Sequence, residues 1–541
     1  MQGMNAQRAD TPALDVTQML RRGLHLHRQN RFAEAEQLYL DALEQDPNSF
    51  QGFHLLAVLR MQQGALADAL ELVATGIERS ASPEKALALC VPTLTKLAAE
   101  FRAESRHDEA LSCYDLILAV PGEGDIIHDR CVALLSLGRF EEALADAERC
   151  IGKSPDNVMA HFSRGNALRE LNRWEDAVAA YERVLALDPD VANAHRNLAG
   201  ALRVLGRLDD AISHFDRALA LGANDIETRA GKGLLLLSTG KFAEGWAQYD
   251  GRLDDRTPGT TRNYPQRRWA GEAVDGTLLV WGEQGLGDQI LYASMIPDLA
   301  GRATHVVAEV APRLADLFAR SFPGIKVVPV EQGLHRGPVA AHAPIGSIGQ
   351  YLRRSFEDFP RRDGFLVADA ERTAALRTRL AAGGRRVIGI SWNSRNPAFE
   401  KAKSAALADF ASIFRLPNCR FVDLQYGDTA GERARLQKDM GVTLEHLDDI
   451  DTTQDIDGLA ALISACDAVA TVSNTTAHLA GALGRPVWTF VPFGPARMWY
   501  WFDGRSDSPF YGRMQVRPQG RGQSWADLIA AAAPEIESAL A

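Results

Sequence analysis

A spacing of 34 residues recurs along the first part of the chain and limits what that part can fold into. Three series of residues share this interval: Gly138, Asn172, Gly206 and Gly240; Ala143, Ala177 and Ala211; and Tyr181, Phe215 and Tyr249. Each period predicts two helices, with a small residue on the first helix where an aromatic side chain of the second packs back. Proline closes several units where the chain must leave a helix. The repeat therefore predicts a stacked array of helix pairs over residues 1–252.

These features resemble the tetratricopeptide repeat. Seven units are expected, starting near Val16, Phe50, Val91, Gly124, Val158, Ala192 and Ile226. The second and third are further apart and match the pattern least well, with Pro83 and Pro92 around an irregular helix. The resemblance implies an α-solenoid whose concave groove binds polypeptide. Candidate acceptor-binding residues on the first helices are Asn166, Arg169, Asn197 and Arg203, although each of them fits equally well as a solvated helix position.

The composition of the whole chain limits the classes of protein to which it can belong. A chain of 541 residues with 46% hydrophobic and 24% charged residues should hold two to four globular domains. No segment reaches the ~20 apolar residues of a membrane span, and residues 1–10 lack a signal-peptide core, so a cytoplasmic location is expected. The six cysteines form no Cys-x-x-Cys pair, which predicts free thiols and no metal site. The net charge of −11, with basic residues only in isolated pairs, argues against nucleic acid as a partner.

After a linker at residues 253–275, an α/β pattern begins, and residues 276–384 are expected to form its first half. A strand at 277–281 leads into the loop 282–288 (GEQGLGD) and a helix from about Gln289. Gly285 and Gly287 would let a ligand approach the backbone, and Asp288 could be a general base held in a cleft. Acids are also favoured at helix N-termini for electrostatic reasons alone. The glycines read G-x-x-G-x-G, yet Glu309 at the ribose-binding position keeps a Rossmann oxidoreductase as an alternative.

Residues 385–541 are expected to form the second, donor-binding half. The strand 386–392 ends at Trp392, a candidate donor-binding residue, and the loop after it carries Arg395, Lys401 and Lys403. Cations at this edge could stabilise a departing phosphate, because negative charge develops on its oxygen in the transition state. A solvated, lysine-rich loop is the alternative interpretation.

A strand, turn and helix at residues 467–483 give the second half its most site-like segment. The turn contains four small polar residues, Ser473, Asn474, Thr475 and Thr476, and His478 follows in the first turn of the helix. Such a turn can cap a helix and leave its first N–H groups free to hold an anion. In open α/β sheets ligands bind at the carboxyl ends of the strands, where this turn lies. The segment predicts a phosphate-bearing ligand, with an ordinary capped helix as the alternative.

Two such halves around a cleft resemble the GT-B glycosyltransferases, and four strings resemble the heptosyltransferase-like family 9 branch: GLGD at 285–288, KS at 403–404, FVDLQYGD at 421–428 and HLAGALGRP at 478–486. By that resemblance Asp288 matches the family's proposed catalytic acidic residue, and the lysines and the turn before His478 match its nucleotide-phosphate contacts. Ser473 stands where many heptosyltransferases have aspartate, which removes a negative charge and would suit an anionic sugar.

Fused to tetratricopeptide repeats, the α/β region looks like that of bacterial proteins that glycosylate flagellin. The resemblance implies an inverting, metal-independent protein O-glycosyltransferase without a resident cofactor. It would transfer a nonulosonic acid of the pseudaminic-acid type from a CMP donor to Ser or Thr of flagellin or another polypeptide acceptor. One alternative is a lipopolysaccharide or capsule sugar transferase of the heptosyltransferase type, and another is a tetratricopeptide scaffold with an inactive transferase half.

Overall fold

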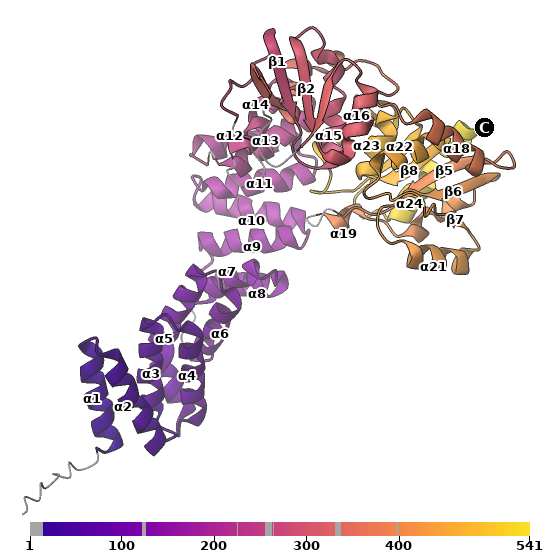
Figure 1. Cartoon of the computed structure of the whole chain (residues 1–541). Helices are drawn as coiled ribbons and strands as arrows, with labels where there is room; N and C mark the ends of the chain where they lie inside the picture. Colours follow the sequence, from indigo (N-terminus) through magenta and orange to yellow (C-terminus); the bar gives the residue numbers. More distant parts are fainter. Residues whose placement is uncertain are drawn as a thin grey trace, which may run out of the picture. The chain divides into compact units, whose positions relative to one another are not determined.

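A computed structural model describes residues 14–121, 126–223, 225–254, 262, 264–330, 337–395 and 399–541. The chain forms two compact units, Met1–Leu202 and Arg203–Ala541. The first is helical, and the second combines helices with two mainly parallel β-sheets (Figure 1). The expectations for residues 1–10, for a repeat starting at Gly124 and for the middle of the linker, 255–261, fall outside the described residues.

Fourteen helices follow one another as seven pairs in the part of the chain described up to residue 254. They are α1 (Val16–Arg28), α2 (Phe32–Gln45), α3 (Phe50–Gln62), α4 (Leu66–Arg79), α5 (Pro83–Ala103), α6 (His107–Leu118), α7 (Ile127–Ser136), α8 (Phe140–Lys153), α9 (Val158–Glu170), α10 (Trp174–Leu187), α11 (Ala192–Val204), α12 (Leu208–Ala220), α13 (Ile226–Ser238) and α14 (Phe242–Tyr249). The N-terminal region is therefore the α-solenoid that the 34-residue spacing predicts.

The contact between a glycine and an aromatic ring explains the repeat at the level of atoms. A Cβ on Gly165 would stand 2.5 Å from Cε1 of Tyr181, and a Cβ on Gly23 would stand 2.6 Å from the same atom of Tyr39. Both tyrosines are fully buried. The first helix of each of these pairs can approach the second because the position opposite the ring has no side chain.

The third pair departs from the expected register. Its first helix, α5, begins at Pro83 and not near Val91, and it runs through Pro92 for 21 residues. Proline at the first helical position costs no hydrogen bond, because the N–H it lacks would have had no partner within the helix. Pro83 therefore starts the helix, and Pro92 does not end it.

The last helices of the repeat belong to the second compact unit. Phe242, Trp246 and Tyr249 of α14 are buried in the same hydrophobic core as strand β1 (Val274–Trp281). The Trp246 Nε1–H donates a hydrogen bond of 2.8 Å to the carbonyl of Arg353. The repeat pattern thus extends to about residue 252, whereas the compact units divide at Leu202.

A four-stranded parallel sheet of order β3-β2-β1-β4 forms what we call the first α/β half. Its remaining strands are β2 (Ala303–Val310), β3 (Lys326–Pro329) and β4 (Ala341–Pro344), and its helices include α15 (Leu286–Ala293), α16 (Ala315–Ser321) and α17 (Gly349–Leu352). Figure 1 shows β1 and β2 with α15 and α16 beside them. The predicted strand at 277–281 corresponds to β1.

A seven-stranded sheet of order β10-β11-β9-β8-β5-β6-β7 forms the second α/β half. Its strands are β5 (Arg386–Ser391), β6 (Cys419–Asp423), β7 (Leu444–Glu445), β8 (Ala468–Val472), β9 (Val487–Val491), β10 (Asp507–Ser508) and β11 (Tyr511–Pro518). The helices are α18 (Ala370–Leu380), α19 (Glu400–Lys403), α20 (Ala411–Phe414), α21 (Ala430–Met440), α22 (Ile456–Ala465), α23 (Thr475–Ala482) and α24 (Trp525–Leu540). All neighbouring strands run parallel except β10 and β11.

Helix α18 belongs with this second half, although it precedes residue 385. Arg377 pairs with Asp467 at 2.8 Å and Arg379 pairs with Asp449 at 3.1 Å, both in segments of the second half. The chain therefore passes between the halves before α18, earlier than the expected boundary at 384.

Two general properties of the chain can be read from the structure. All six cysteines are free thiols, as their scattered spacing predicts, and five of them are buried. Among the helices in the described ranges, none has both the length and the apolar character needed to cross a membrane.

Candidate functional site

A pocket of about 390 Å³ lies where the two α/β halves meet. We call it the cleft pocket. Loops that follow strands of both parallel sheets form it, as the rule for open α/β sheets anticipates. The first half contributes Gly285, Leu286, Gly287, Asp288 and Arg313; the second contributes Ser394, Arg395, Lys403, Tyr426, Thr452, Thr453, Ile456, Leu459, Ser473, Asn474, Thr475, Thr476, His478 and Tyr500.

Asp288 lies in the first turn of α15, on the cleft side of the first half. Its carboxylate Oδ2 accepts a hydrogen bond of 3.2 Å from the Gly285 N–H. Burial raises the pKa of Asp288 to about 6, and Glu283 acts in the same direction, while the Gly285 N–H and the charge of Lys403 oppose the shift. A carboxylate with this pKa is ionised at neutral pH and accepts a proton far more readily than a solvated aspartate does.

Lys403 is the cation of the second half whose positive charge interacts with the carboxylate of Asp288. It ends the short helix α19 and is 6% exposed, with its ammonium 5.4 Å from the centre of the Phe399 ring. Burial lowers the pKa of Lys403, and the charge of Asp288 opposes this effect. An amine so poorly hydrated gains most when an anion enters the pocket beside it.

The N-terminus of α23 forms another wall of the pocket. Asn474 caps the helix by accepting from the Ala477 N–H. Its own amide donates to Ser391 Oγ at 2.8 Å and to the carbonyl of Asn393 at 2.9 Å, which ties the turn to the end of β5. A helix leaves its first N–H groups without an intrahelical partner, and the cap takes only one of them.

Two hydroxyl groups in this wall have no hydrogen-bond partner. Ser473 Oγ and Thr476 Oγ1 are buried and unpaired among the described residues, with Ser473 4% and Thr476 0% exposed. A buried hydroxyl without a partner costs free energy, so it calls for a ligand or another special explanation. Together with the helix N-terminus, these hydroxyls form a set of donors suited to an anion.

His478 is held rigidly behind this turn. Its Nδ1 lies 2.9 Å from the hydroxyl of Tyr511, and its ring stacks on Trp501 with centroids 5.1 Å apart. Burial, followed by the charge of Lys403, lowers the pKa of His478 to about 3. The imidazole is therefore neutral at physiological pH and adds no positive charge to the pocket.

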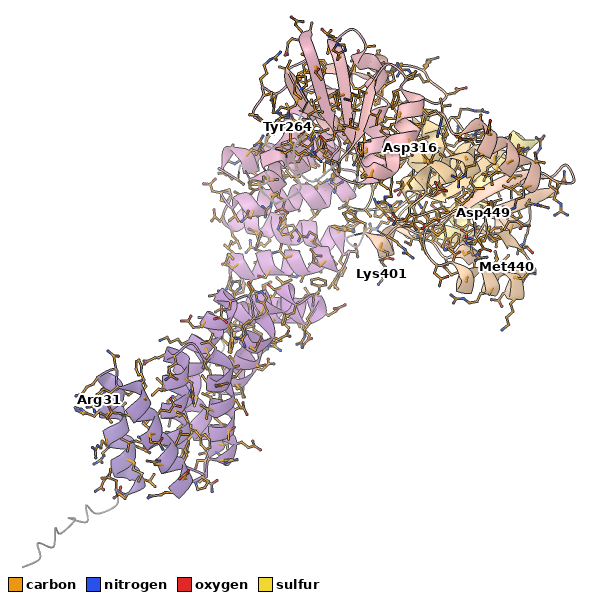
Figure 2. The ribbon with its side chains drawn as sticks, viewed as in Figure 1. Arg31, Tyr264, Asp316, Lys401, Met440 and Asp449 are labelled. Atoms are coloured by element: carbon orange, nitrogen blue, oxygen red, sulfur yellow. The ribbon has the colours of Figure 1, made fainter. Side chains whose placement is uncertain are left out.

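The other candidates from the second half divide into those that face the pocket and those that do not. Arg395 lines the pocket, and its backbone N–H donates to the Tyr426 hydroxyl at 2.9 Å. Lys401 is exposed and does not line the pocket, and its side chain projects from the surface (Figure 2). Trp392 is fully buried and donates from Nε1 to Glu432 at 3.0 Å, so its side chain belongs to the core.

Sequence reasoning missed several residues that line the pocket, among them Arg313, Tyr426 and Tyr500. Arg313 belongs to the first half, and it donates from Nη1 to the carbonyl of Thr453 in the second half at 2.6 Å. It follows shortly after the end of β2, the same type of position as the loop after β1. The rule on strand ends could therefore have identified it.

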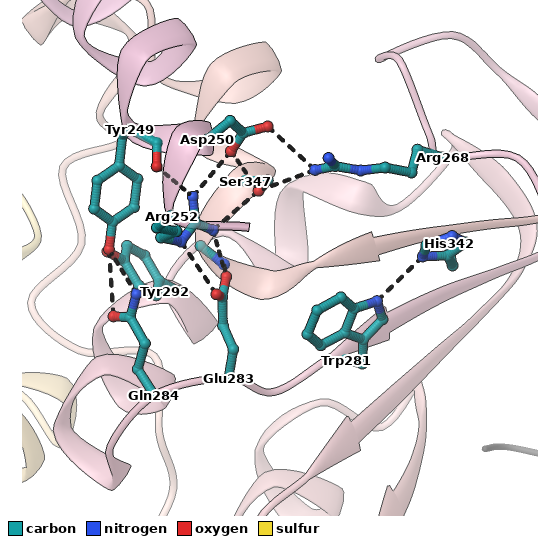
Figure 3. A network of polar contacts seen from close by, with 11 residues as sticks. Tyr249, Asp250, Arg252, Arg268, Trp281, Glu283, Gln284, Tyr292, His342 and Ser347 are labelled. Atoms are coloured by element: carbon teal, nitrogen blue, oxygen red, sulfur yellow. Dashed lines mark hydrogen bonds and ion pairs between the residues drawn. The ribbon is translucent and has the colours of Figure 1, made fainter. Parts of the chain in front are cut away.

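A network of polar contacts holds the glycine loop in place (Figure 3). Glu283 accepts from Arg252 Nε at 3.1 Å and from the Gly346 N–H at 3.0 Å. Gln284 adopts a left-handed φ of 61°, which is uncommon for a residue other than glycine, and its amide donates to the Tyr249 hydroxyl at 2.9 Å. The last solenoid helix, α14, thus fixes the loop that leads to Asp288.

The four acceptor-binding candidates lie in different environments. Asn166 Oδ1 accepts from the Tyr181 hydroxyl at 2.8 Å and from the Asn197 amide at 2.9 Å, and Asn197 is 7% exposed. Arg169 pairs with the neighbouring Glu170 at 2.7 Å. Arg203 lines a separate cavity in the second unit, described below. The structure therefore brings Asn166 and Asn197 into contact.

No group of His, Cys, Asp or Glu side chains suited to hold a metal ion occurs within the described ranges. The glutamate at the proposed ribose position, Glu309, is 3% exposed and accepts from the Tyr264 hydroxyl at 2.8 Å. It is thus engaged in a buried contact and is not part of the cleft pocket.

The fold and comparisons with known proteins together define the class. A family model described as tetratricopeptide repeat matches residues 6–50, 20–86, 130–177 and 162–226. The chain is accordingly a protein with tetratricopeptide repeats, followed by an α/β region with parallel sheets. It is similar to Protein FlbA of Caulobacter vibrioides, with 28% identity over 515 residues that cover 90% of this chain and 85% of the relative.

Two solved structures similar to this chain each cover less than half of it. YrrB, described as a TPR protein with an unusual peptide-binding site, is 18% identical, covers 36% of this chain and is itself 97% covered, with a TM-score of 0.29. The C-terminal part of a TPR repeat-containing protein from Cytophaga hutchinsonii is 14% identical, covers 43% of this chain and is itself 94% covered, with a TM-score of 0.32.

Proposed function

We propose that this chain is a glycosyltransferase that moves a sugar from a nucleotide donor to a hydroxyl group of a polypeptide. The observation that carries the proposal is the composition of the cleft pocket. It holds a carboxylate with a raised pKa on one wall, and Lys403 and the N-terminus of α23 on the other. A proton acceptor opposite an anion-binding wall is what transfer from a phosphate leaving group requires.

In this reaction Asp288 takes the proton of the acceptor hydroxyl. The freed oxygen attacks the anomeric carbon from the face opposite the phosphate, and the bond between that carbon and the phosphate oxygen breaks. The electron pair stays on the phosphate oxygen, where Lys403, Arg395 and the N–H groups at Thr475 and Thr476 stabilise the new charge. Attack from the opposite face inverts the configuration at the anomeric carbon, and the step requires no metal ion.

The anion wall suits a cytidine monophosphate donor of a nonulosonic acid. Such a donor brings a phosphate and a sugar carboxylate, and therefore more than one anionic group, into the same pocket. Ser473, which replaces the aspartate of many heptosyltransferases, adds no negative charge beside them. Its unpartnered hydroxyl, with that of Thr476, can donate to either anion.

The solenoid supports a polypeptide as the acceptor. Tetratricopeptide repeats form extended concave surfaces of the kind that bind polypeptide chains. The similarity to Protein FlbA over most of both chains supports a flagellin-related role. We therefore propose flagellin as the acceptor, modified at serine or threonine.

Intact-mass analysis of flagellin tests this proposal. Candidate flagellins are co-expressed with the full chain and with a pathway that makes a CMP-nonulosonic acid. The expected result is a set of masses separated by the residue mass of the sugar, which disappears when either the chain or the donor pathway is omitted. Unmodified flagellin in the complete system would contradict the proposal, and a change in lipopolysaccharide sugars instead would indicate a lipid acceptor.

A further inference from the structure

A second cavity of about 240 Å³ lies in the same compact unit, separate from the cleft pocket. We call it the arginine cavity. Its walls are mostly apolar and aromatic, with two arginines and one aspartate among them: Arg203, Val204, Leu234, Ser238, Phe399, Phe493, Gly494, Pro495, Arg497, Met498, Trp499, Phe502 and Asp503. The residues up to Ser238 come from the end of α11 and from α13, and the rest belong to the second α/β half.

The charges in the arginine cavity do not balance. Arg497 pairs with Asp503 at 3.2 Å and also donates to the carbonyl of Trp501 at 3.1 Å. Arg203 forms no ion pair or hydrogen bond with any of the described residues, and Asp503 is the acid that acts on its charge. Two cations therefore share one carboxylate, which leaves a net positive charge against aromatic walls. Burial lowers the pKa of both arginines, since each has lost part of its hydration.

The arginine cavity and the cleft pocket share their dividing wall. Phe399 lines the cavity, while Lys403, whose ammonium lies 5.4 Å from the centre of the Phe399 ring, lines the pocket. On the other side, Trp499 lines the cavity and its neighbour Tyr500 lines the pocket, with ring centroids 5.7 Å apart. A chain segment in the cavity would thus lie one aromatic layer away from the site of transfer.

We infer that the arginine cavity binds an acidic side chain of the acceptor polypeptide, close in sequence to the hydroxyl that receives the sugar. This inference rests on the proposed function and adds a preference for the acceptor sequence. Arg203 supplies an unpaired guanidinium, which binds a carboxylate in a bidentate manner. The solenoid helices that build one wall favour a polypeptide over a sugar acid as the occupant. The acidic side chain would anchor the segment and hold its hydroxyl towards Asp288.

Peptide selection on the full chain, without donor, tests this inference. A pool of degenerate peptides with a fixed central serine is passed over the immobilised protein, and the retained peptides are sequenced. The wild type is expected to enrich aspartate and glutamate at positions near the serine. The enrichment should fall by about tenfold in Arg203→Gln, the usual effect of losing one charge-assisted contact. It should fall less in Arg203→Lys, which keeps the charge but loses the bidentate geometry.

Two further variants keep the test decisive. Arg207→Gln is the matched control, because Arg207 is an exposed arginine of the same region that pairs with Asp210 at 2.8 Å outside the cavity. Asp503→Asn should increase the retention of acidic peptides, since it removes the one competing carboxylate. A misfolded variant cannot give this gain, so it separates a role in binding from damage to the fold.

The outcomes distinguish this inference from the proposed function. Enrichment of acids that depends on Arg203 supports the inference even if no sugar is transferred. Active transfer without any preference for acids, or an equal preference in wild type and Arg203→Gln, overturns the inference and leaves the proposed function standing. A free nonulosonic acid that binds in an Arg203-dependent way, with no enrichment of acidic peptides, would assign the cavity to the sugar and overturn the inference as well.

Discussion

Gly287 and His478 come from the two α/β halves and touch at the base of the cleft pocket. A Cβ on Gly287 would stand 2.9 Å from Cδ2 of His478. The imidazole has little freedom to move away, because it stacks on Trp501 and contacts the Tyr511 hydroxyl. The position of Asp288, the next residue in the chain, therefore depends on how closely the two halves pack.

Gly287→Ala should consequently destabilise the α/β unit and reduce transfer together. Overpacking of this kind costs about 1–3 kcal/mol, visible as a lower melting temperature. Gly324→Ala is the control, because a Cβ there would meet nothing within 4 Å. If thermal unfolding showed the same melting temperature for Gly287→Ala as for wild type, the close packing described here would be wrong.

Lys403→Ala and Lys401→Ala should differ strongly, although the two lysines lie two positions apart. Lys403 lines the cleft pocket, and removal of one well-placed donor to a developing anion costs about 3 kcal/mol, or roughly a hundredfold in turnover. Lys401 is exposed outside the pocket, so its loss should leave turnover close to wild type. Steady-state kinetics on both variants test this difference. An equal loss of turnover in the two variants would show that Lys403 has no special role.

Removal of the unpartnered hydroxyl of Thr476 should not lower the stability of the protein, but it should weaken nucleotide binding. Thr476→Val removes a buried hydroxyl that has no protein partner, so the melting temperature without ligand should stay the same or rise. If this hydroxyl donates to phosphate, the affinity for cytidine monophosphate should fall by about tenfold, as for one hydrogen bond to a charged group. Calorimetric titration and thermal unfolding measure the two effects.

Thr471→Val is the matched control for this pair of measurements. Thr471 is equally buried, but its hydroxyl donates to the Val472 carbonyl at 2.9 Å and to Asn474 at 3.2 Å. Its loss should therefore lower stability. Nucleotide affinity that is unchanged in Thr476→Val would show that the anion does not contact this hydroxyl.

The sequence predicted much of this architecture for identifiable reasons. The 34-residue spacing records a contact between helices, such as Gly165 on Tyr181, and so it predicted the pairs. It could not show that α14 packs into the α/β core, because burial of Trp246 depends on residues far along the chain. Strand β4 was missed because its four residues, AHAP, include a proline and are too few to show a pattern. Strand β11 was also missed, because its sequence, YGRMQVRP, is interrupted by glycine and arginine and ends in proline.

The sequence predicted the part of the candidate site that lies in loops following β-strands. Loops after β5 and β8 had to meet at one edge of their sheet, where they supply Lys403 and the turn before α23. The loop after β1 belongs to the other sheet and supplies Asp288 from across the cleft pocket. Which of Lys401 and Lys403 faces inward depends on the single helical turn of α19, which the sequence did not specify. The side chain of Trp392 lies in the core, since a residue at a strand end can face the core as readily as a ligand. Arg313 follows the end of β2 and was predictable by the same rule, but its hydrogen bond to the Thr453 carbonyl depends on the packing of one half on the other, which no local pattern records.

The raised pKa of Asp288 predicts how transfer and stability depend on pH. Transfer should increase as the pH rises through about 6, because the ionised form is the base. Stability should change in the opposite sense. The folded state holds this proton more tightly than the unfolded state, so the contribution of Asp288 to stability is present below the ordinary aspartate pKa and is lost as the pH rises through about 6. Initial rates and melting temperatures across this range check both signs.

Asp288→Asn on the full chain decides whether Asp288 is the base, with transfer to flagellin and thermal unfolding measured on one preparation. Asparagine keeps the shape but cannot accept the proton, so transfer should fall by roughly 10²- to 10⁴-fold, while the melting temperature at neutral pH should not fall. Asp316→Asn, in the first turn of α16 and exposed (Figure 2), should leave transfer unchanged. A less stable Asp288→Asn protein that still transfers sugar at the normal rate would contradict the account, because Asp288 would then be a structural residue and not the base.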